Sequence, residues 1–384
     1  MPDQSNLPTP ENREVNVLKS RPFLSGLVAL VVLGVILFGW YIYSGHLEKK
    51  KRLLDAEAQQ KVTTGLEAIR NDEGAQAIGI LQEAVASAQN TDTRALSEFN
   101  LGTALHVAGR KIEAVAKLKE VANNEEVSPY IRAKAIEYMA RMFFLTHDGE
   151  VFRAIFTGKP YDDFEIDGAK DISIRNLLEY GESLYPMGLA QLKIARLYGE
   201  EMIEKKSKDP TTIALIKSYI DKAEPELATP DPVLHRNLVS RKAMAVGWLY
   251  ELGDDSYGDP EKYYREIMEL EHTKQHSKLS GAGEKIRYAM FLVRVYRSTR
   301  SADIKTLIQE GVNSPGFKES NIYQIINNER GELLKVAPAN SGAYDIALAE
   351  SNPALSFDAK TLLLVAKIDP FFKKALSDLG WNIK

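Results

Sequence analysis

The sequence predicts an all-α protein in which one N-terminal transmembrane helix is followed by a solenoid of helix pairs. Three observations predict it. An uncharged apolar segment runs from Phe23 to Tyr43, apolar residues recur at helical spacing through the rest of the chain, and a helix pair is repeated at an offset of 37 residues. Alternating β-branched runs of strand length are scarce, so we expect no sheet.

The segment before the apolar run is expected to lack structure. Residues 1–21 are rich in proline, asparagine and acidic side chains and contain few large apolar ones. Such a composition cannot bury enough apolar surface to offset the entropy of ordering the chain. We therefore predict a disordered N-terminal tail.

Residues 22–44 are expected to form an uncleaved membrane anchor. A helix crosses the ~30 Å bilayer core in roughly 20 apolar residues. Phe23–Tyr43 has that length and ends in Trp40, Tyr41 and Tyr43, where an interfacial aromatic belt would lie. A cleavable signal peptide has a shorter apolar region and a small-residue cleavage site, and a buried core helix would have a polar face. The segment fits neither alternative.

The charges around the anchor leave its orientation open. The tail carries three basic residues, and the segment after the anchor carries more, which favours a cytoplasmic C-terminal part. Large domains can cross the membrane against this bias, so the opposite orientation also stays open. The basic residues after the anchor are Lys49, Lys50, Lys51, Arg52 and Lys61.

Composition excludes several classes of function. The formal net charge of -4 argues against nucleic acid as a partner, because phosphate binding needs a basic face. The chain has no cysteine, which excludes thiol nucleophiles, thiolate zinc sites and iron–sulfur clusters. Phosphate-binding loops, nucleophile elbows and dinucleotide fingerprints are also absent from the sequence. We expect a non-catalytic protein without a cofactor.

Helix starts are marked by a repeated device, in which an Asp or Ser precedes a proline. The side-chain oxygen can accept from the first N–H groups of the helix, and proline fits a position where no donor is needed. The pairs begin at Ser128, Asp209, Asp231, Asp259 and Asp369.

An internal repeat lies in the first part of the soluble region. The segment from Ala58 superposes on the segment from Ala95 at an offset of 37 residues, which aligns Gly65 with Gly102 and Leu81 with Leu118. A period in the thirties, with one helix pair per unit, is typical of an α-solenoid.

The second unit resembles a tetratricopeptide repeat. Leu101 and Gly102 match the leucine–glycine pair of the first helix, Gly109 fits the turn, and Ala114 and Leu118 fit the second helix. The small residues would let two helices approach closely while leucines fill the seam. We expect two such repeats over residues 45–128.

Residues 129–384 are expected to hold further, degenerate helical repeats. Candidate pairs combine Ile131–Leu145 with Val151–Phe156, Ala243–Asp255 with Gly258–Met268, and Lys285–Arg297 with Ile304–Val312.

The layout as a whole is similar to that of the bacterial anchored repeat proteins typified by the ancillary subunit of the Sec translocon. The similarity lies in Gly39-Trp40, the aromatic Tyr41 and Tyr43, a short polar joint and a long helix leading into repeats. It implies a single-pass protein of the plasma (inner) membrane whose repeats lie outside the cytoplasm and bind proteins. The basic run Lys49–Arg52 departs from it. Between the two orientations we expect the outward one.

A partner-binding groove is the expected site. In tetratricopeptide arrays the first helix of each pair lines a concave groove. The residues at those positions are Val62, Arg70, Phe99, Thr103 and His106. Members that clamp a carboxylate use Lys and Asn where this chain has Phe99 and Thr103, so a mixed apolar groove for a peptide or helix is expected instead. The alternative for Phe99 is a place in the core.

Three other features suggest chemistry less strongly. His272 and His276 are spaced to share a helix face and are weak candidates for a metal site, with a polar helix end as the alternative. The aspartates at 254, 255 and 259 fail the spacing of a calcium loop and fit a turn and a helix cap. An acidic loop from Lys159 to Asp171 is either a solvated connection or a docking segment for a basic partner.

The function expected from the sequence is a membrane-anchored scaffold that presents a curved helical surface to protein partners near the bilayer. Two alternatives remain: an envelope structural or self-assembling protein, and a metal-dependent enzyme centred on His272 and His276.

Overall fold

The structure is a computed structural model that describes residues 21–71, 73–158, 170–272, 281–314, 316–318, 320–336, 355–378 and Trp381. Within these ranges the chain forms sixteen α-helices, one 3-10 helix and no strand. The predicted all-α class is therefore confirmed for this part of the chain.

The first eight helices run from the N-terminus into the middle of the molecule. They are α1 (Arg21–Arg70), α2 (Gly74–Ser87), α3 (Thr91–Val107), α4 (Lys111–Asn123), α5 (Pro129–Thr146), α6 (Gly149–Phe156), α7 (Lys170–Leu184) and α8 (Gly188–Glu204). The remaining elements are α9 (Pro210–Leu227), α10 (Pro232–Leu252), α11 (Glu261–His272), α12 (Gly281–Tyr296), η2 (Arg297–Arg300), α13 (Ser301–Val312), α14 (Asn321–Val336), α16 (Phe357–Ile368) and α17 (Pro370–Asp378).

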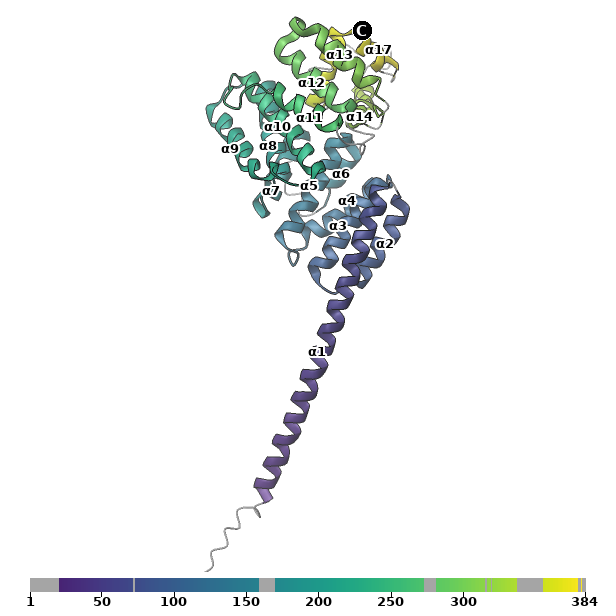
Figure 1. Cartoon of the computed structure of the whole chain (residues 1–384), viewed down its shortest axis with the longest axis vertical. Coiled ribbons are helices and arrows are strands. Elements are labelled where there is room, and N and C mark those ends of the chain that lie inside the picture. Colours follow the sequence, from purple (N-terminus) through teal and green to yellow (C-terminus); the bar gives the residue numbers. More distant parts are fainter. Residues whose placement is uncertain are drawn as a thin grey trace, which may run out of the picture.

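Helix α1 is a long rod, and the other helices gather at its C-terminal end (Figure 1). Its last turns pack on α2 and α3, so the rod continues directly into the folded body. Three hydrophobic cores follow one another along that body and share helices, because α8 contributes to the first and third and α10 to the second and third.

No helix among the described residues is both long enough and apolar enough to cross a bilayer. The backbone is helical from Arg21 onward, but most side chains from Phe23 to Gly39 lie outside the described residues, as does the predicted tail up to Ser20. The membrane anchor at 22–44 therefore stays a prediction.

Glycine lets the helices of the first two pairs approach closely. A Cβ atom built on Gly65 would lie 2.7 Å from Cγ of Leu81, and one built on Gly102 would lie 2.9 Å from Cγ of Leu118. Both leucines are fully buried. The close approach predicted at Gly102 is confirmed, and the same geometry recurs one 37-residue offset earlier.

The same device reappears at later helix crossings. A Cβ atom on Gly181 would meet Ile136, one on Gly199 would meet Trp248, and one on Gly311 would meet Ile286, all at 2.5–2.9 Å. In each case a glycine of one helix faces a large buried side chain of another. Interior packing leaves no room there for an added methyl group.

Polar contacts also repeat at the 37-residue offset. Oδ1 of Asp55 accepts from the N–H of Asn90 at 2.9 Å, just before α3. Oδ1 of Asp92 accepts from the N–H of Ser128 at 2.8 Å, just before α5. Each carboxylate thus holds the start of the next unit and satisfies an N–H that has no helical partner.

Two ion pairs join residues 37 positions apart in different parts of the chain. Nζ of Lys111 lies 3.0 Å from Asp148, and Nζ of Lys217 lies 3.1 Å from Asp254. The spacing of the helix pairs is therefore similar at the two places, although the sequence similarity is clear only in the first two units.

Four of the five predicted helix starts are capped by the predicted side chain, and the start at Ser128 is not. The side chains of Asp209, Asp231, Asp259 and Asp369 each accept from a backbone N–H at the beginning of a helix. Ser128 makes no such bond with its side chain. Its own N–H instead donates to Asp92, so the neighbouring repeat supplies the oxygen at this start.

The C-terminal helices fold back onto the middle of the chain. Arg196 of α8 forms ion pairs with Glu200 and, at 2.9 Å, with Asp358 of α16. Lys360 of α16 contacts Glu204 of α8 at 2.8 Å, and Asn328 of α14 donates to the carbonyl of Thr146 at the end of α5. A linear repeat array makes contacts only between neighbouring units, so this closure lies outside the repeat rhythm.

Replacing Gly102 by alanine tests the helix crossing. We expect Gly102→Ala to lower the free energy of unfolding by about 1–3 kcal/mol, because the added methyl overpacks against Leu118. The measurement is urea unfolding of the full-length protein in detergent, followed by circular dichroism.

The matched control is Gly79→Ala in α2, where a Cβ atom meets nothing within 4 Å. Alanine is there expected to raise stability by ~0.5–1 kcal/mol through its better helix propensity. Equal effects of the two substitutions would contradict the account.

Candidate functional site

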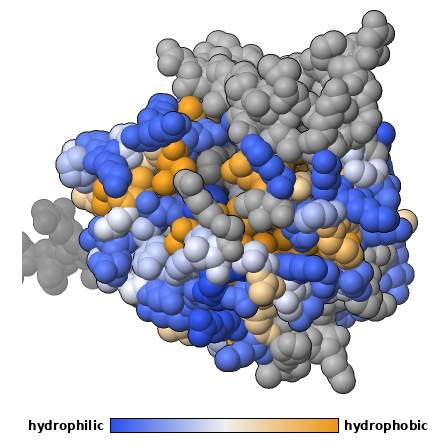
Figure 2. Space-filling model, turned by 90° about the horizontal axis from the view of Figure 1, so that it is seen from above, coloured by the Kyte–Doolittle hydropathy of each residue, from blue (hydrophilic) through white to orange (hydrophobic). Residues whose placement is uncertain are grey.

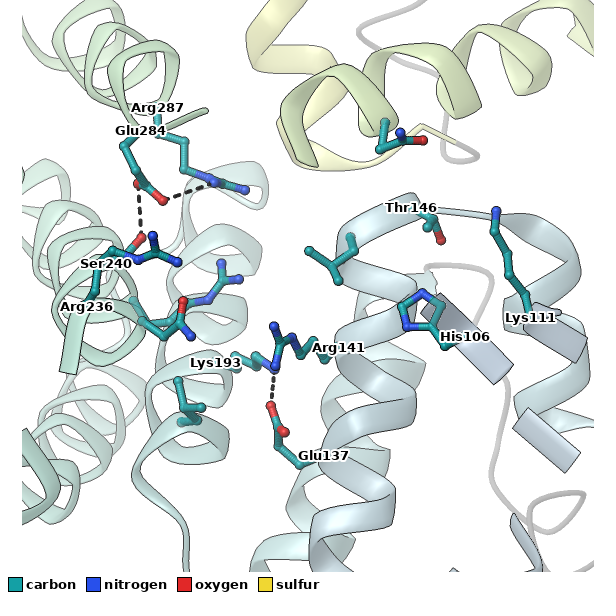
Figure 3. A pocket seen from close by; sticks show the side chains of 15 residues that line it. His106, Lys111, Glu137, Arg141, Thr146, Lys193, Arg236, Ser240, Glu284 and Arg287 are labelled. Atoms are coloured by element: carbon teal, nitrogen blue, oxygen red, sulfur yellow. Dashed lines mark hydrogen bonds and ion pairs between the residues drawn. The ribbon is translucent and has the colours of Figure 1, made fainter. Parts of the chain in front are cut away.

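A cavity of about 430 Å³ lies where the middle and C-terminal helices face one another. Figure 3 shows its walls, with α5 on one side, α10 and α12 on the other, and Lys193 of α8 between them. Residues of α3, α4 and α14 complete the lining. The lining residues are His106, Lys111, Glu137, Arg141, Leu145, Thr146, Leu189, Lys193, Arg236, Asn237, Ser240, Arg241, Glu284, Arg287 and Gln324.

The cavity is lined by an excess of positive charge. Two of its lining residues are carboxylates, Glu137 and Glu284, while six are lysine or arginine. Glu137 forms an ion pair with the buried Lys193. Glu284 accepts from Ser240 at 3.0 Å and lies 3.6 Å from Arg287.

Two of the arginines have no carboxylate partner among the described residues. The guanidinium of Arg141 lies 5.8 Å from the ring centroid of Tyr138. The guanidinium of Arg241 lies 3.7 Å from the sulfur of Met244. These contacts leave both charges without a neutralising anion at ion-pair distance.

The pKa values of two cationic groups in the lining are lowered by burial. Burial lowers the pKa of Arg241 to about 9, and the neighbouring cations Arg287 and Arg196 act in the same direction. Burial lowers the pKa of Lys193 to about 8, despite its pair with Glu137. Positive charge is therefore held here against both desolvation and mutual repulsion.

A stripe of alternating aromatic and cationic side chains runs along α5 to this cavity. Tyr130, Lys134, Tyr138 and Arg141 follow one another at helical spacing, and the charged groups lie over the rings at 5.2–5.8 Å. The ring of Tyr130 also meets the ring of Tyr185, the residue after α7, with centroids 5.0 Å apart, and both tyrosines are more than 40% exposed. The stripe connects an exposed edge of the body with the charged cavity.

Three of the predicted groove residues flank this stripe. Phe99 packs edge to face on Tyr138 with ring centroids 5.8 Å apart, and Nδ1 of His106 lies 3.1 Å from the hydroxyl of Tyr138. Thr103 is half-buried between them and donates to the carbonyl of Phe99. His106 also lines the cavity.

Two of the groove predictions need correction. Phe99 and Val62 are only 8% and 6% exposed and belong to the first hydrophobic core. The alternative that placed Phe99 in the core is the one that the structure has, because Tyr138 and Lys134 cover its ring. Arg70, at the last turn of α1, is exposed.

His106 is held neutral. Burial, with help from Arg141 and Lys111, lowers the pKa of its imidazole to about 4. At neutral pH it therefore adds a hydrogen-bonding group, and no charge, to the cavity wall.

The other sequence candidates lie largely outside the described residues. His276 and positions 159–169 of the acidic loop are not among them, nor is the side chain of His272. Where side chains are described, no group of three metal-ligating residues is found. Two of the aspartates before α11 have structural partners, since Asp254 pairs with Lys217 of α9 and Asp259 accepts from the N–H of Glu261.

A buried cluster of charges lies behind the cavity. Arg196 faces Glu200 and Asp358, and all three side chains are at most 5% exposed. Asp358 remains ionised because, against burial, Arg196 and Arg287 hold its pKa at about 2. Burial raises the pKa of Glu200 to about 8, and the neighbouring carboxyl groups of Asp358 and Asp171 act in the same direction, against Arg196.

The cationic cavity was missed from the sequence. Arg236, Arg241 and Lys193 lie on helices whose polar positions suggest a solvated face. Only the packing of α12 on α10 and of α14 on α5 brings these side chains to a common cavity. A charge-rich stretch such as His235–Lys242, inside a helix as long as α10, is the one available signal.

We compared the chain with models of protein families, with curated proteins and with solved structures, and none of them matches it. The similarities to tetratricopeptide repeats and to the translocon subunit family therefore remain predictions.

Replacing Glu200 by glutamine tests the buried cluster. A carboxyl group whose folded pKa is raised binds more protons in the folded than in the unfolded state, so stability falls as pH rises from about 4.5 to about 8. We expect the free energy of unfolding of Glu200→Gln, measured relative to that of wild type, to be higher at pH 8.5 than at pH 5 by at least ~1 kcal/mol. Urea unfolding at both pH values measures it.

Glu125→Gln, in the exposed turn before α5, is the control and should follow the wild-type pH profile. A Glu200→Gln protein whose stability changes with pH as wild type does would contradict this description of the cluster.

Proposed function

We propose that this protein is a membrane-anchored, non-catalytic scaffold whose tetratricopeptide-like helix pairs bind protein partners near the bilayer. The observation that carries the proposal is the stripe on α5, in which the exposed Tyr130 is followed by the partly exposed Lys134, Tyr138 and Arg141, with each cation over an aromatic ring. Tyrosine and arginine are the side chains that most often dominate protein–protein interfaces.

The anchor is supported by the sequence and by the exposed part of α1. The described apolar side chains of this rod are unpacked, with Leu33, Leu37, Trp40, Tyr41 and Tyr43 between 55% and 73% exposed. A soluble protein rarely leaves so much contiguous apolar surface in water. A bilayer around residues 22–44 would cover the leucines and place the three aromatic residues at its interface.

The continuity of α1 supports a tether of defined length. The helix has 50 residues, which corresponds to about 75 Å at 1.5 Å per residue. Its first half would lie in the membrane and its last turns pack on α2, so the body would be held close to the bilayer surface. Tethering raises the effective concentration of the binding surface for partners in the same membrane.

The repeat character is supported by packing. Gly65 and Gly102 face equivalent leucines, and Asp55 and Asp92 make equivalent contacts, at the offset that the sequence predicts. We propose the plasma (inner) membrane as the location, with the helical body outside the cytoplasm. The resemblance to anchored repeat proteins favours this side, and the basic run Lys49–Arg52 favours the other.

Photo-crosslinking in cells tests the proposal. A photo-reactive residue is placed at Tyr130 or Tyr185 of the full-length protein, and products are identified by mass spectrometry after an alkaline carbonate wash of the membranes. We expect the protein to stay with the membranes and to crosslink to a small set of proteins, whose compartment identifies the side of the membrane.

The control position is Lys208, an exposed residue in the turn between α8 and α9. Identical products from all three positions would refute a specific surface on α5. Products that contain only this protein would favour self-assembly, and release by carbonate would refute the anchor.

A further inference from the structure

The cationic cavity has the dimensions of a small-molecule site. Its volume of about 430 Å³ falls in the range of pockets that enclose a ligand and is too small for a folded partner. It is bounded by side chains from seven helices, which span the sequence from His106 of α3 to Gln324 of α14. Residues gathered from such distant segments form a site only in the closed fold.

Some cationic side chains of the cavity form ion pairs with carboxylates of the protein, and others do not. Lys111 at the rim is paired with Asp148, and Lys193 is paired with Glu137. Arg141 from α5 and Arg241 from α10 have no carboxylate at ion-pair distance among the described residues. Both residues line the cavity, and they come from opposite walls of it.

Keeping such charges in a partly buried space works against stability. Desolvation and the repulsion of neighbouring cations already lower the pKa of Arg241 to about 9. A fold that retains an unfavourable cluster of this kind at the wall of a cavity is typical of a functional site. An anion that enters the cavity would remove the repulsion.

We propose that this cavity binds a small molecule that carries two or more negative charges on phosphate or carboxylate oxygens. Arg141 and Arg241 would each grip an oxyanion with the planar, two-pronged geometry of guanidinium. Arg236 and Arg287 would add charge from the α10 and α12 wall, and His106 would add a neutral hydrogen bond. Figure 3 shows Arg141, Arg236, Arg287 and His106 around the same space.

Binding would also couple the two parts of the closed fold. The ligand would contact α5 on one side of the cavity and α10 and α12 on the other. A molecule that binds only this closed arrangement stabilises it in proportion to its concentration over its dissociation constant.

Calorimetric titration of the full-length protein in detergent at low salt tests the proposal. The probes are inorganic pyrophosphate and citrate, with acetate as a singly charged control. We expect saturable 1:1 binding of pyrophosphate, citrate or both, an affinity that falls as salt is raised, and no measurable binding of acetate. Pyrophosphate alone would indicate a phosphate compound, and citrate alone a polycarboxylate.

The decisive variants are Arg141→Gln, Arg241→Gln and the double substitution. Each single change should weaken binding about tenfold or more, because a charge-assisted hydrogen-bonded pair is lost. The variants should melt at the wild-type temperature or above it in the absence of ligand, since each removes an uncompensated cation. Pyrophosphate or citrate should raise the melting temperature of wild type and not that of the double variant.

Lys208→Gln removes a positive charge from the exposed turn after α8 and is the matched control, expected to bind as wild type does. The proposal is overturned if neither probe binds, or if the double variant binds as tightly as wild type. It is also overturned if Lys208→Gln weakens binding as much as the cavity variants do, because the anions would then be attracted by overall charge alone.

Discussion

The buried guanidinium of Arg196 is the contact on which the closed form of this protein depends. It joins Glu200 one turn away on α8 to Asp358 on α16, a residue 162 positions further along the chain. Removing one partner of such a buried pair leaves an uncompensated charge in the interior, at a cost of about 3–5 kcal/mol. The position of α16 is therefore restricted, because Asp358 must lie beside Arg196 to neutralise its buried charge.

This docking and the contact of α14 with the end of α5 together bring the C-terminal helices back onto the middle of the chain. In this closed arrangement, side chains of α5, α8, α10, α12 and α14 line a common cavity. Figure 2 shows this body from above, with hydrophilic residues over much of the visible surface and hydrophobic ones in the recesses between them. The cost of burying so many charges is partly offset by specific pairs such as Lys193 with Glu137 and Arg294 with Glu251.

The repeating part of the fold could be predicted from the sequence, and the site could not. Gly102 and Leu118 belong to one helix pair, so the repeat pattern of the sequence was enough to predict that they pack together. Arg196 and Asp358 follow no period, so nothing in the pattern indicates that they meet. From the sequence alone, charged residues such as Arg141, Lys193 and Arg241 are expected to face solvent. In the structure they line a cavity instead. The pattern placed Phe99 in the partner-binding groove, whereas in the structure its ring belongs to the first core and packs on Tyr138.

Whether α16 docks on α8 is the most direct test of this account. The native chain has no cysteine, so Glu204→Cys and Lys360→Cys introduce a unique pair for a short bis-maleimide crosslinker. The two replaced side chains contact each other at 2.8 Å, and the account predicts an efficient crosslink within one molecule of the full-length protein. A control pair combines Lys360→Cys with Lys51→Cys on the exposed rod of α1 and should not crosslink (Figure 1). If the first pair crosslinks no better than the control pair, or only between molecules, the closed fold is wrong.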